Sequence, residues 1–127
     1  MRYLLDTQVF LWALFEPAKI ALPIRKVLED GRRKLLVSHV SVWEMSIKAR
    51  LGKLRLPDTI EAVVDLACER LALGLLPIRL DHIYRLEGLP PHHKDPFDRL
   101  LAAQSLVDSL VFLTTHPVFK KYRVQTL

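Results

Sequence analysis

Four carboxylates stand out because each lies directly after an expected strand or at the start of an expected helix: Asp6, Glu44, Asp95 and Asp98. Carboxylate oxygens are the ligands that hard cations such as Mg²⁺ and Mn²⁺ prefer. A cluster of such oxygens can hold a cation that activates water for in-line attack on a phosphodiester and stabilises the leaving oxygen. The sequence therefore raises the hypothesis of a metal-dependent phosphodiesterase.

Each acid also has a purely structural explanation. Asp95 precedes a proline, the arrangement of an N-cap and a first helical residue. Asp98 then falls at the third helical position, where an acid favours the helix dipole and can reach back to the N–H of the cap. Asp6 could cap the following helix, and Glu44 could pair with Lys48 for about 0.2–0.5 kcal/mol. The residues alone leave both explanations open.

Apolar periodicity and Gly or Pro breaks divide the chain into short elements. The pattern predicts strands at 3–5, in 34–41, at 75–80 and at 110–114, with a fifth, edge strand at 123–127. It predicts helices over 9–15, 19–30, 42–54 ended by Gly52, and 57–73 ended by Gly74. Further helical segments are expected over 82–89, from Pro96 to about Ser109, and as one turn over 117–122.

Strands that alternate with helices indicate an α/β fold in which a parallel sheet is covered on both faces. Ligands bind beyond the carboxyl ends of such strands. Asp6 follows the first strand, and Glu44 lies in the first turns of the helix after the second. Asp95 and Asp98 open the helix that leads into the fourth strand. Three separate parts of the chain thus deliver four carboxylates to one sheet edge, which helix capping alone does not predict.

The composition fits one domain over residues 1–127. Half of the residues are hydrophobic and 26% are charged, so disorder is not indicated. The net charge of +5 suits a polyanionic partner such as RNA, DNA or an acidic protein. One cysteine and scattered histidines do not make a zinc site. The N-terminus lacks a signal-peptide pattern, and no apolar run approaches the roughly 20 residues of a membrane span, so we expect a cytoplasmic protein without membrane contact.

Four segments together resemble a family. LLDTQVFLW (4–12), SVWEMSIKARLGKL (41–54), HHKDPFDRLLAAQ (92–104) and VFLTTHPVF (111–119) are similar to PIN domains, and more narrowly to VapC-type toxin ribonucleases of toxin–antitoxin pairs. Asp-Thr after a first strand is by itself only a weak indication of this family. The combination of WE-x-x-x-K with HH-x-DPFDR-x-L-x-AQ at these distances is specific, and the similarity covers essentially the whole chain in order.

The resemblance implies a PIN-like three-layer α/β/α sandwich with a mostly parallel sheet of four or five strands and an acidic pocket at its carboxyl edge. It implies Mg²⁺- or Mn²⁺-dependent endonucleolytic cleavage of structured RNA, such as tRNA or rRNA. It also implies a homodimer that is neutralised by a small antitoxin protein whose tail covers the pocket.

Position by position, the resemblance assigns catalytic, metal-binding roles to three acids. Asp6 matches the first acid of the family pattern, Glu44 the second and Asp98 the third. Asp95 matches an additional acid of the DPFDR subgroup, and we interpret it as the helix cap with a possible outer-sphere role at the metal.

Two threonines and one histidine complete the correspondence. Thr7 would orient Asp6 or a metal-bound water, and Thr114 matches the threonine of the family's T-x-D segment. His116 stands where the family has its fourth acid. A neutral imidazole can ligate Mn²⁺ but suits Mg²⁺ poorly, so we expect weaker binding of a second metal and a preference for Mn²⁺. The alternative is that His116 points elsewhere and water fills the gap.

Basic residues near the same edge could hold RNA phosphates: Lys48, Arg50, Lys53 and Arg99, with Arg55 beside them. Solvated helix faces explain each of them equally well. His92 and His93 are expected in loop or supporting roles, because a two-metal mechanism needs no side-chain base.

Two other functions compete with the nuclease. A phosphatase of the haloacid dehalogenase type would use Asp6 as nucleophile, but it needs a second acid two residues later, where this chain has Gln8. A PIN-like module that binds RNA or protein, with catalysis weakened through His116, is the other alternative. Such a module would bind RNA equally well with chelator present and leave the RNA intact.

Overall fold

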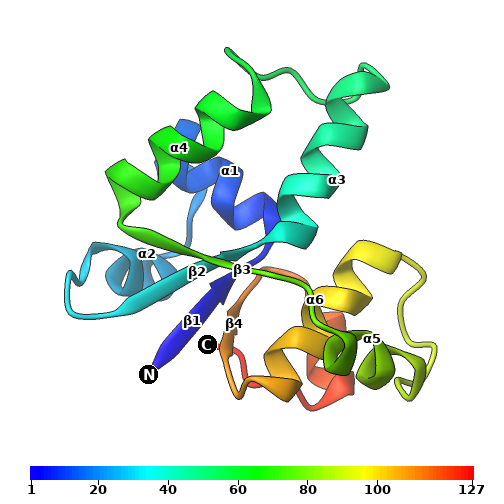
Figure 1. Ribbon diagram of the computed structural model, residues 1–127. Coiled ribbons are helices and arrows are strands. Elements are labelled where there is room, and N and C mark those ends of the chain that lie inside the picture. Colours follow the sequence, from blue (N-terminus) through cyan, green and yellow to red (C-terminus); the bar gives the residue numbers. More distant parts are fainter.

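Four short strands form the centre of the molecule: β1 (Arg2–Leu5), β2 (Lys34–Ser38), β3 (Leu73–Leu76) and β4 (Val111–Leu113). A computed structural model describes all residues, 1–127 (Figure 1). The strands pair in the order β3-β2-β1-β4, and all three pairings are parallel. The expected α/β fold with a parallel sheet is confirmed.

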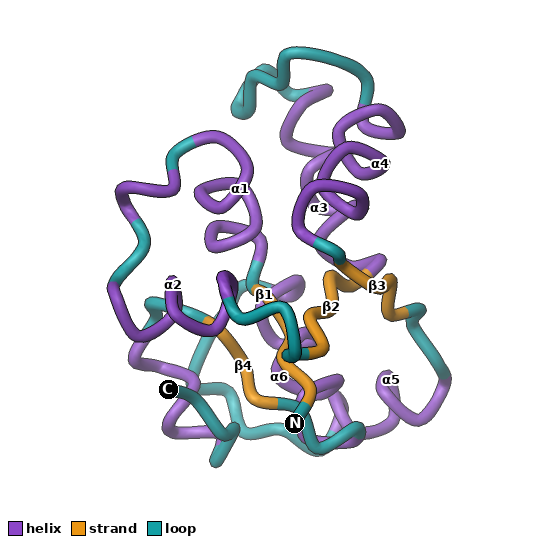
Figure 2. Tube along the Cα trace, turned by 90° about the vertical axis from the view of Figure 1, so that its left-hand side faces the viewer, coloured by secondary structure: helices purple, strands orange, loops and turns teal.

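Helices cover both faces of this sheet and make three layers (Figures 1 and 2). The chain from β1 to β3 forms α1 (Thr7–Phe15), the 3₁₀ turn η1 (Pro17–Lys19), α2 (Leu22–Glu29), α3 (His39–Arg50) and α4 (Ile60–Leu71). The chain after β3 forms α5 (Leu80–Glu87), α6 (Pro96–Val107) and the 3₁₀ helix η2 (Pro117–Tyr122). None of the helices is long and apolar enough to cross a membrane.

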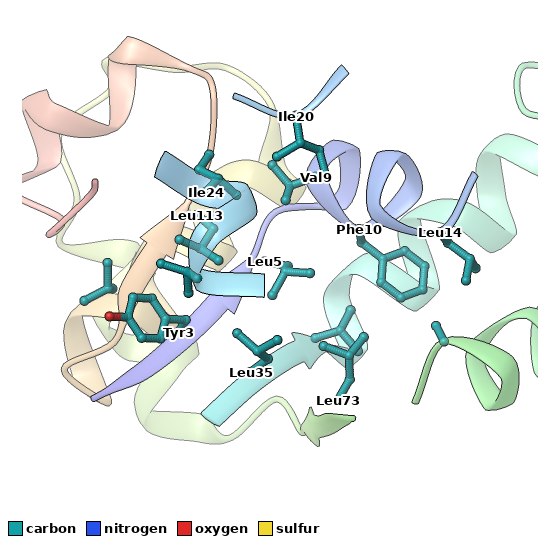
Figure 3. Close-up of a cluster of buried hydrophobic side chains, with 14 of the residues drawn as sticks. Tyr3, Leu5, Val9, Phe10, Leu14, Ile20, Ile24, Leu35, Leu73 and Leu113 are labelled. Atoms are coloured by element: carbon teal, nitrogen blue, oxygen red, sulfur yellow. The ribbon is translucent and has the colours of Figure 1, made fainter. Parts of the chain in front are cut away.

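Two hydrophobic cores lie on opposite faces of the sheet, because successive strand side chains point to opposite sides. Tyr3 and Leu5 enter the core under α1, α2 and α4, whereas Leu4 between them enters the core against α6 and η2. Figure 3 shows the first core, with Phe10 and Leu14 of α1 above the strands. Both faces are thus buried, as the uninterrupted apolar strand sequences predicted.

The third strand and the helix before it differ from their predicted bounds. The strand is Leu73–Leu76 rather than 75–80, and the helix ends at Leu71 rather than at Gly74. The helix stops because Ala72 adopts the left-handed conformation, with φ 53°. Gly74 is instead a strand residue, where a Cβ would lie 3.0 Å from a methyl carbon of Leu36. Close packing against β2, and not helix termination, therefore explains this glycine.

Smaller differences concern other boundaries. The helix predicted from 57 begins later, because Thr59 is its N-cap and accepts the N–H of Ala62 at 3.2 Å. The segment 123–127 forms only an isolated bridge between Thr126 and Phe112, so the sheet has four strands and not five. Arg123 begins that segment in the left-handed conformation, at the end of η2, which leaves few residues for a strand.

The strand order reverses between β1 and β4. The chain proceeds from β1 outward to β2 and β3, and then returns to place β4 on the other side of β1. Helices leave the two sides of such a reversal in opposite directions, which opens a crevice at the carboxyl ends of the two central strands. Asp6 directly follows β1 and Thr114 directly follows β4, so both residues lie at this crevice.

Candidate functional site

A cleft of about 370 Å³ occupies the carboxyl edge of the sheet. We call it the acidic cleft, and it is lined by Asp6, Thr7, Gln8, Leu11, Glu44, Met45, Lys48, Lys53, Leu54, His93, Asp95, Asp98 and His116. All four carboxylates singled out in the sequence line it. They come from three separate segments, so the fold gathers acids that are up to 92 positions apart in the chain.

Asp6 is tied to both a helix and the sheet. Its backbone N–H donates to the carbonyl of Leu113, and its Oδ1 accepts the N–H of Val9 at 2.7 Å, so it does cap α1. Its Oδ2 accepts the hydroxyl of Thr114 at 2.6 Å, across the reversal in strand order. Only 2% of Asp6 is exposed, and burial raises the pKa of its carboxyl above 3.8 despite these donors.

Glu44 is held from two sides although only 4% of it is exposed. Its Oε1 accepts the hydroxyl of Thr7 at 2.6 Å, and its Oε2 contacts the Lys48 ammonium. The Thr7 oxygen also lies 2.9 Å from Ser41 Oγ. Because the Thr7 proton is used on the carboxylate, Ser41 must donate to Thr7. Thr7 thus orients Glu44, whereas the sequence analysis expected it to orient Asp6 or a metal-bound water.

Asp95 and Asp98 share the first turn of α6 but play different parts. Asp95 Oδ1 accepts the N–H groups of Phe97 at 2.9 Å and of Asp98 at 3.1 Å, so Asp95 is the N-cap. Asp98 does not reach back to the cap. Its Oδ2 lies 2.8 Å from Nε2 of His93, and the remainder of its side chain faces the acidic cleft. Burial, with Asp95 and Glu44 as like-charged neighbours, raises the pKa of Asp98.

His93 lies in the loop before α6 and supports Asp98, a loop or supporting role as expected, although the sequence did not indicate this particular contact. The loop before α6 is fastened at this residue, whose backbone N–H donates to the buried Tyr122 hydroxyl at 2.8 Å. The anchored loop presents the His93 ring to Asp98. Two histidines one residue before DPFD were a visible signal, but the contact with Tyr122 joins residues 29 positions apart and has no local pattern.

His116 reaches the same cleft from the loop after β4. Its backbone N–H donates to the Thr114 hydroxyl oxygen at 3.1 Å, and its ring centroid is 6.4 Å from that of His93. The charge of a protonated His116 lowers the pKa of Asp6, which opposes the effect of burial. Because Asp6 and His116 line the same cleft, His116 is positioned near the acids rather than away from them.

The predicted phosphate-binding residues divide into two groups. Lys48 and Lys53 line the acidic cleft, whereas Arg50 is exposed and does not line it. Arg99 points elsewhere: its Nη2 donates to the carbonyl of Leu89 at 3.1 Å and so braces the loop before α6. Only the two lysines are therefore positioned to meet a phosphate in the cleft.

The residues fit a hard divalent cation in kind, although they do not form a closed ligand shell. No three of the acidic, histidine or cysteine side chains converge as a ready metal cage. Burial raises the pKa of both Asp6 and Asp98. The charge of Asp98 adds to the rise at Asp6, and the charges of Asp95 and Glu44 add to the rise at Asp98. A cation relieves such repulsion, and oxygen ligands suit Mg²⁺ or Mn²⁺.

Similarity to known proteins covers most of the chain. The model of the PIN domain family matches residues 3–124. Ribonuclease VapC16 of Mycobacterium tuberculosis is 34% identical over 70 residues, which are 52% of this chain and 48% of that protein. The match thus spans about half the length of that curated relative.

Solved structures share the fold along their whole length. VapBC2 of Rickettsia felis, bound to a DNA fragment from its promoter, gives a TM-score of 0.74 at 15% identity, covering 100% of this chain and 97% of that one. DNA-bound VapBC of Salmonella typhimurium gives a TM-score of 0.72 at 19% identity, with the same coverage of both chains. VapBC-1 of nontypeable Haemophilus influenzae gives a TM-score of 0.67 at 21% identity, again with the same coverage of both chains.

Proposed function

The chain belongs to the PIN domain family, and from that premise we propose that it is a metal-dependent endoribonuclease of the VapC type, the toxin of a toxin–antitoxin pair. The observation that carries the proposal is the acidic cleft. Asp6, Glu44 and Asp98 come from three segments and meet beside two lysines at the reversal in strand order. Capping explains Asp6, and the pairing with Lys48 explains Glu44, but neither explains why these acids face one cleft together with Asp98.

In this proposal Asp6, Glu44 and Asp98 would hold Mg²⁺ or Mn²⁺, with Asp95 in support and His116 at the position of the missing fourth acid. The bound cation would activate water and stabilise the leaving oxygen of the phosphodiester. The chain's own contribution is orientation: Thr114 fixes the Asp6 carboxylate, and Thr7 fixes that of Glu44.

In this proposal the basic residues attract the phosphates of the substrate. Lys48 and Lys53 line the cleft beside the acids, where a phosphate approaching the cation would come within reach of an ammonium group. The net charge of +5 favours approach of a polyanion over the whole surface. Structured RNA such as tRNA or rRNA is the proposed substrate.

The proposed partners are a second copy of the chain and an antitoxin protein. The solved structures of similar fold are VapBC complexes, which supports an antitoxin partner for this chain as well. Exposed apolar side chains offer surface for both contacts, among them Trp43, which is 54% exposed and packs edge-on against Phe97 at 5.0 Å.

Cleavage of a total tRNA and rRNA pool by the purified chain, freed of any copurified antitoxin, tests the proposal. Reactions with Mn²⁺, Mg²⁺ or EDTA are compared, with Asp6→Asn as the control for contaminating nucleases. We expect metal-dependent cutting by the wild type, and its loss in Asp6→Asn, Glu44→Gln and Asp98→Asn, because each variant removes charge at nearly constant size. Full activity in any one variant would refute the role of that acid.

One observation favours the alternative of a binding module. Both oxygens of Asp6 and both oxygens of Glu44 already accept protein donors, and His116 supplies no negative charge. A chain that binds RNA equally in Mn²⁺ and in EDTA, and leaves it uncut, would be such a module.

A further inference from the structure

The pairing of Glu44 with Lys48 differs from an ordinary salt bridge on a helix surface. The two residues are one helical turn apart on α3, the spacing at which exposed pairs contribute little. Here the Glu44 side chain is only 5% exposed, whereas that of Lys48 is 43% exposed. The ammonium therefore reaches in from the solvent side of the cleft and neutralises a desolvated carboxylate, which otherwise would carry an unpaired buried charge.

The ammonium also takes the one Glu44 oxygen that the Thr7 hydroxyl does not contact. Oε1 is occupied by the buried Thr7 hydroxyl, which Ser41 holds in turn. Oε2 remains for any ligand that enters from the cleft, and Lys48 occupies it. An ammonium and a divalent cation at this oxygen would be like charges at contact distance, so they exclude each other.

We propose that the Lys48 ammonium is a built-in counter-ion of Glu44 that a divalent cation must displace, and that the displaced ammonium then binds the substrate phosphate. The inference deepens the proposed function and rests on it. Lys48 lines the same cleft as the acids, so rotation of its flexible side chain is enough to move the charge from carboxylate to phosphate. Lys48 thus neutralises Glu44 until the cation arrives and contacts the substrate afterwards.

Competition at Glu44 predicts that removal of the ammonium strengthens metal binding. Lys48→Met should bind Mn²⁺ about tenfold more tightly than the wild type, the size of effect that one neighbouring charge has on a proton equilibrium. Lys48→Arg keeps the charge and should bind Mn²⁺ as the wild type does. Lys53→Met is the matched control, because Lys53 lines the same cleft without an ion pair, and its effect should stay within about twofold.

Isothermal titration of each metal-free protein with Mn²⁺, without RNA, measures these affinities independently of catalysis. Lys48→Gln serves as a second neutral variant, and circular dichroism establishes that all variants fold. A Lys48→Met affinity equal to that of Lys53→Met, or weaker than wild type, would overturn this inference and leave the nuclease proposal standing. Absence of Mn²⁺ binding in every protein, Lys48→Met included, would overturn both.

The second half of the inference has a separate measurement. At saturating Mn²⁺, Lys48→Met should raise the KM for RNA severalfold while kcat changes less, because the missing ammonium contacts the substrate phosphate rather than the reacting water. An unchanged KM would show that the displaced ammonium does not bind RNA.

Discussion

Asp6 accepts an N–H from α1 on one oxygen and the Thr114 hydroxyl on the other, so one side chain joins α1, the residue after β4 and the acidic cleft. Asp95 likewise caps α6 while it lines the cleft. The structural and functional explanations of these acids are therefore compatible. A helix N-terminus stabilises a carboxylate and also holds it at a fixed place.

The Asp98 carboxyl should destabilise the metal-free chain at neutral pH. Burial raises its pKa above 3.8, so its unfavourable contribution is complete above the folded-state pKa and vanishes below about pH 3.8, where both states are protonated. Asp98→Asn should therefore melt at a higher temperature than wild type at pH 7 in EDTA. The difference should shrink as the pH falls toward 3.8, and thermal melts across this range measure it. A variant that melts lower at pH 7 would contradict the argument.

Replacement of His116 by an acid tests whether a fourth carboxylate at this position contributes to cleavage. His116→Asp restores a negative oxygen ligand beside Asp6, so Mg²⁺-supported cleavage should rise roughly tenfold, the usual scale of a change around a metal site. Initial rates in Mg²⁺ and Mn²⁺ measure the effect. Thr115→Asp, which adds the same charge one residue earlier on the exposed loop, is the control. Equal rates in wild type and His116→Asp would show that this position does not contribute.

At the scale of elements, α6 matters most to the site, because its first turn carries both Asp95 and Asp98. Asp95→Ala removes the cap and should cost about 1 kcal/mol of unfolding free energy, whereas Asp95→Asn should cost about 0.5 kcal/mol or less because Asn also caps well. Urea unfolding measures both. If Asp95→Asn keeps its stability but loses all cleavage, Asp95 is a metal ligand rather than a cap alone.

The end of α4 offers a stabilising substitution. Ala72 has a left-handed backbone, which is sterically unfavourable for a residue with a Cβ atom. Because Ala72 is exposed, its replacement by glycine loses no packing. Ala72→Gly should stabilise the protein by roughly 0.5–1 kcal/mol. Ala62→Gly, inside the same helix, should destabilise it by about 1 kcal/mol. Urea unfolding of the two variants should therefore give opposite signs, and a loss of stability in Ala72→Gly would argue against this C-cap.

At the scale of the whole molecule, the cleft lies between the two layers that the sheet separates, so cation binding should stabilise the entire fold. At a Mn²⁺ concentration 100 times the dissociation constant, the gain is about 2.7 kcal/mol. Thermal melts with and without Mn²⁺ should show a higher midpoint for wild type and almost no shift for Asp6→Asn. An equal shift in both proteins would place the cation outside the acidic cleft.

Much of the fold could be predicted from the sequence because its signals are local. Apolar runs of three to five residues marked the strands, and Asp95 before a proline marked the start of α6. The strand–helix alternation then required a parallel sheet, and the parallel sheet required that acids after strands or at helix starts share one edge. Hence the four carboxylates could be assigned to one end of the sheet, although each had a structural explanation of its own.

Tertiary structure alone decided what those carboxylates contact. The Thr114–Asp6 hydrogen bond spans 108 positions, and the loop that brings His93 to Asp98 is fixed by Tyr122 of η2. The start of β3 likewise depends on pairing with β2. Gly74, which the sequence analysis assigned to the end of a helix, is part of that strand and pairs with Leu36. Periodicity and capping act between neighbours in the chain, whereas these contacts exist only after the sheet and its two helical layers have packed.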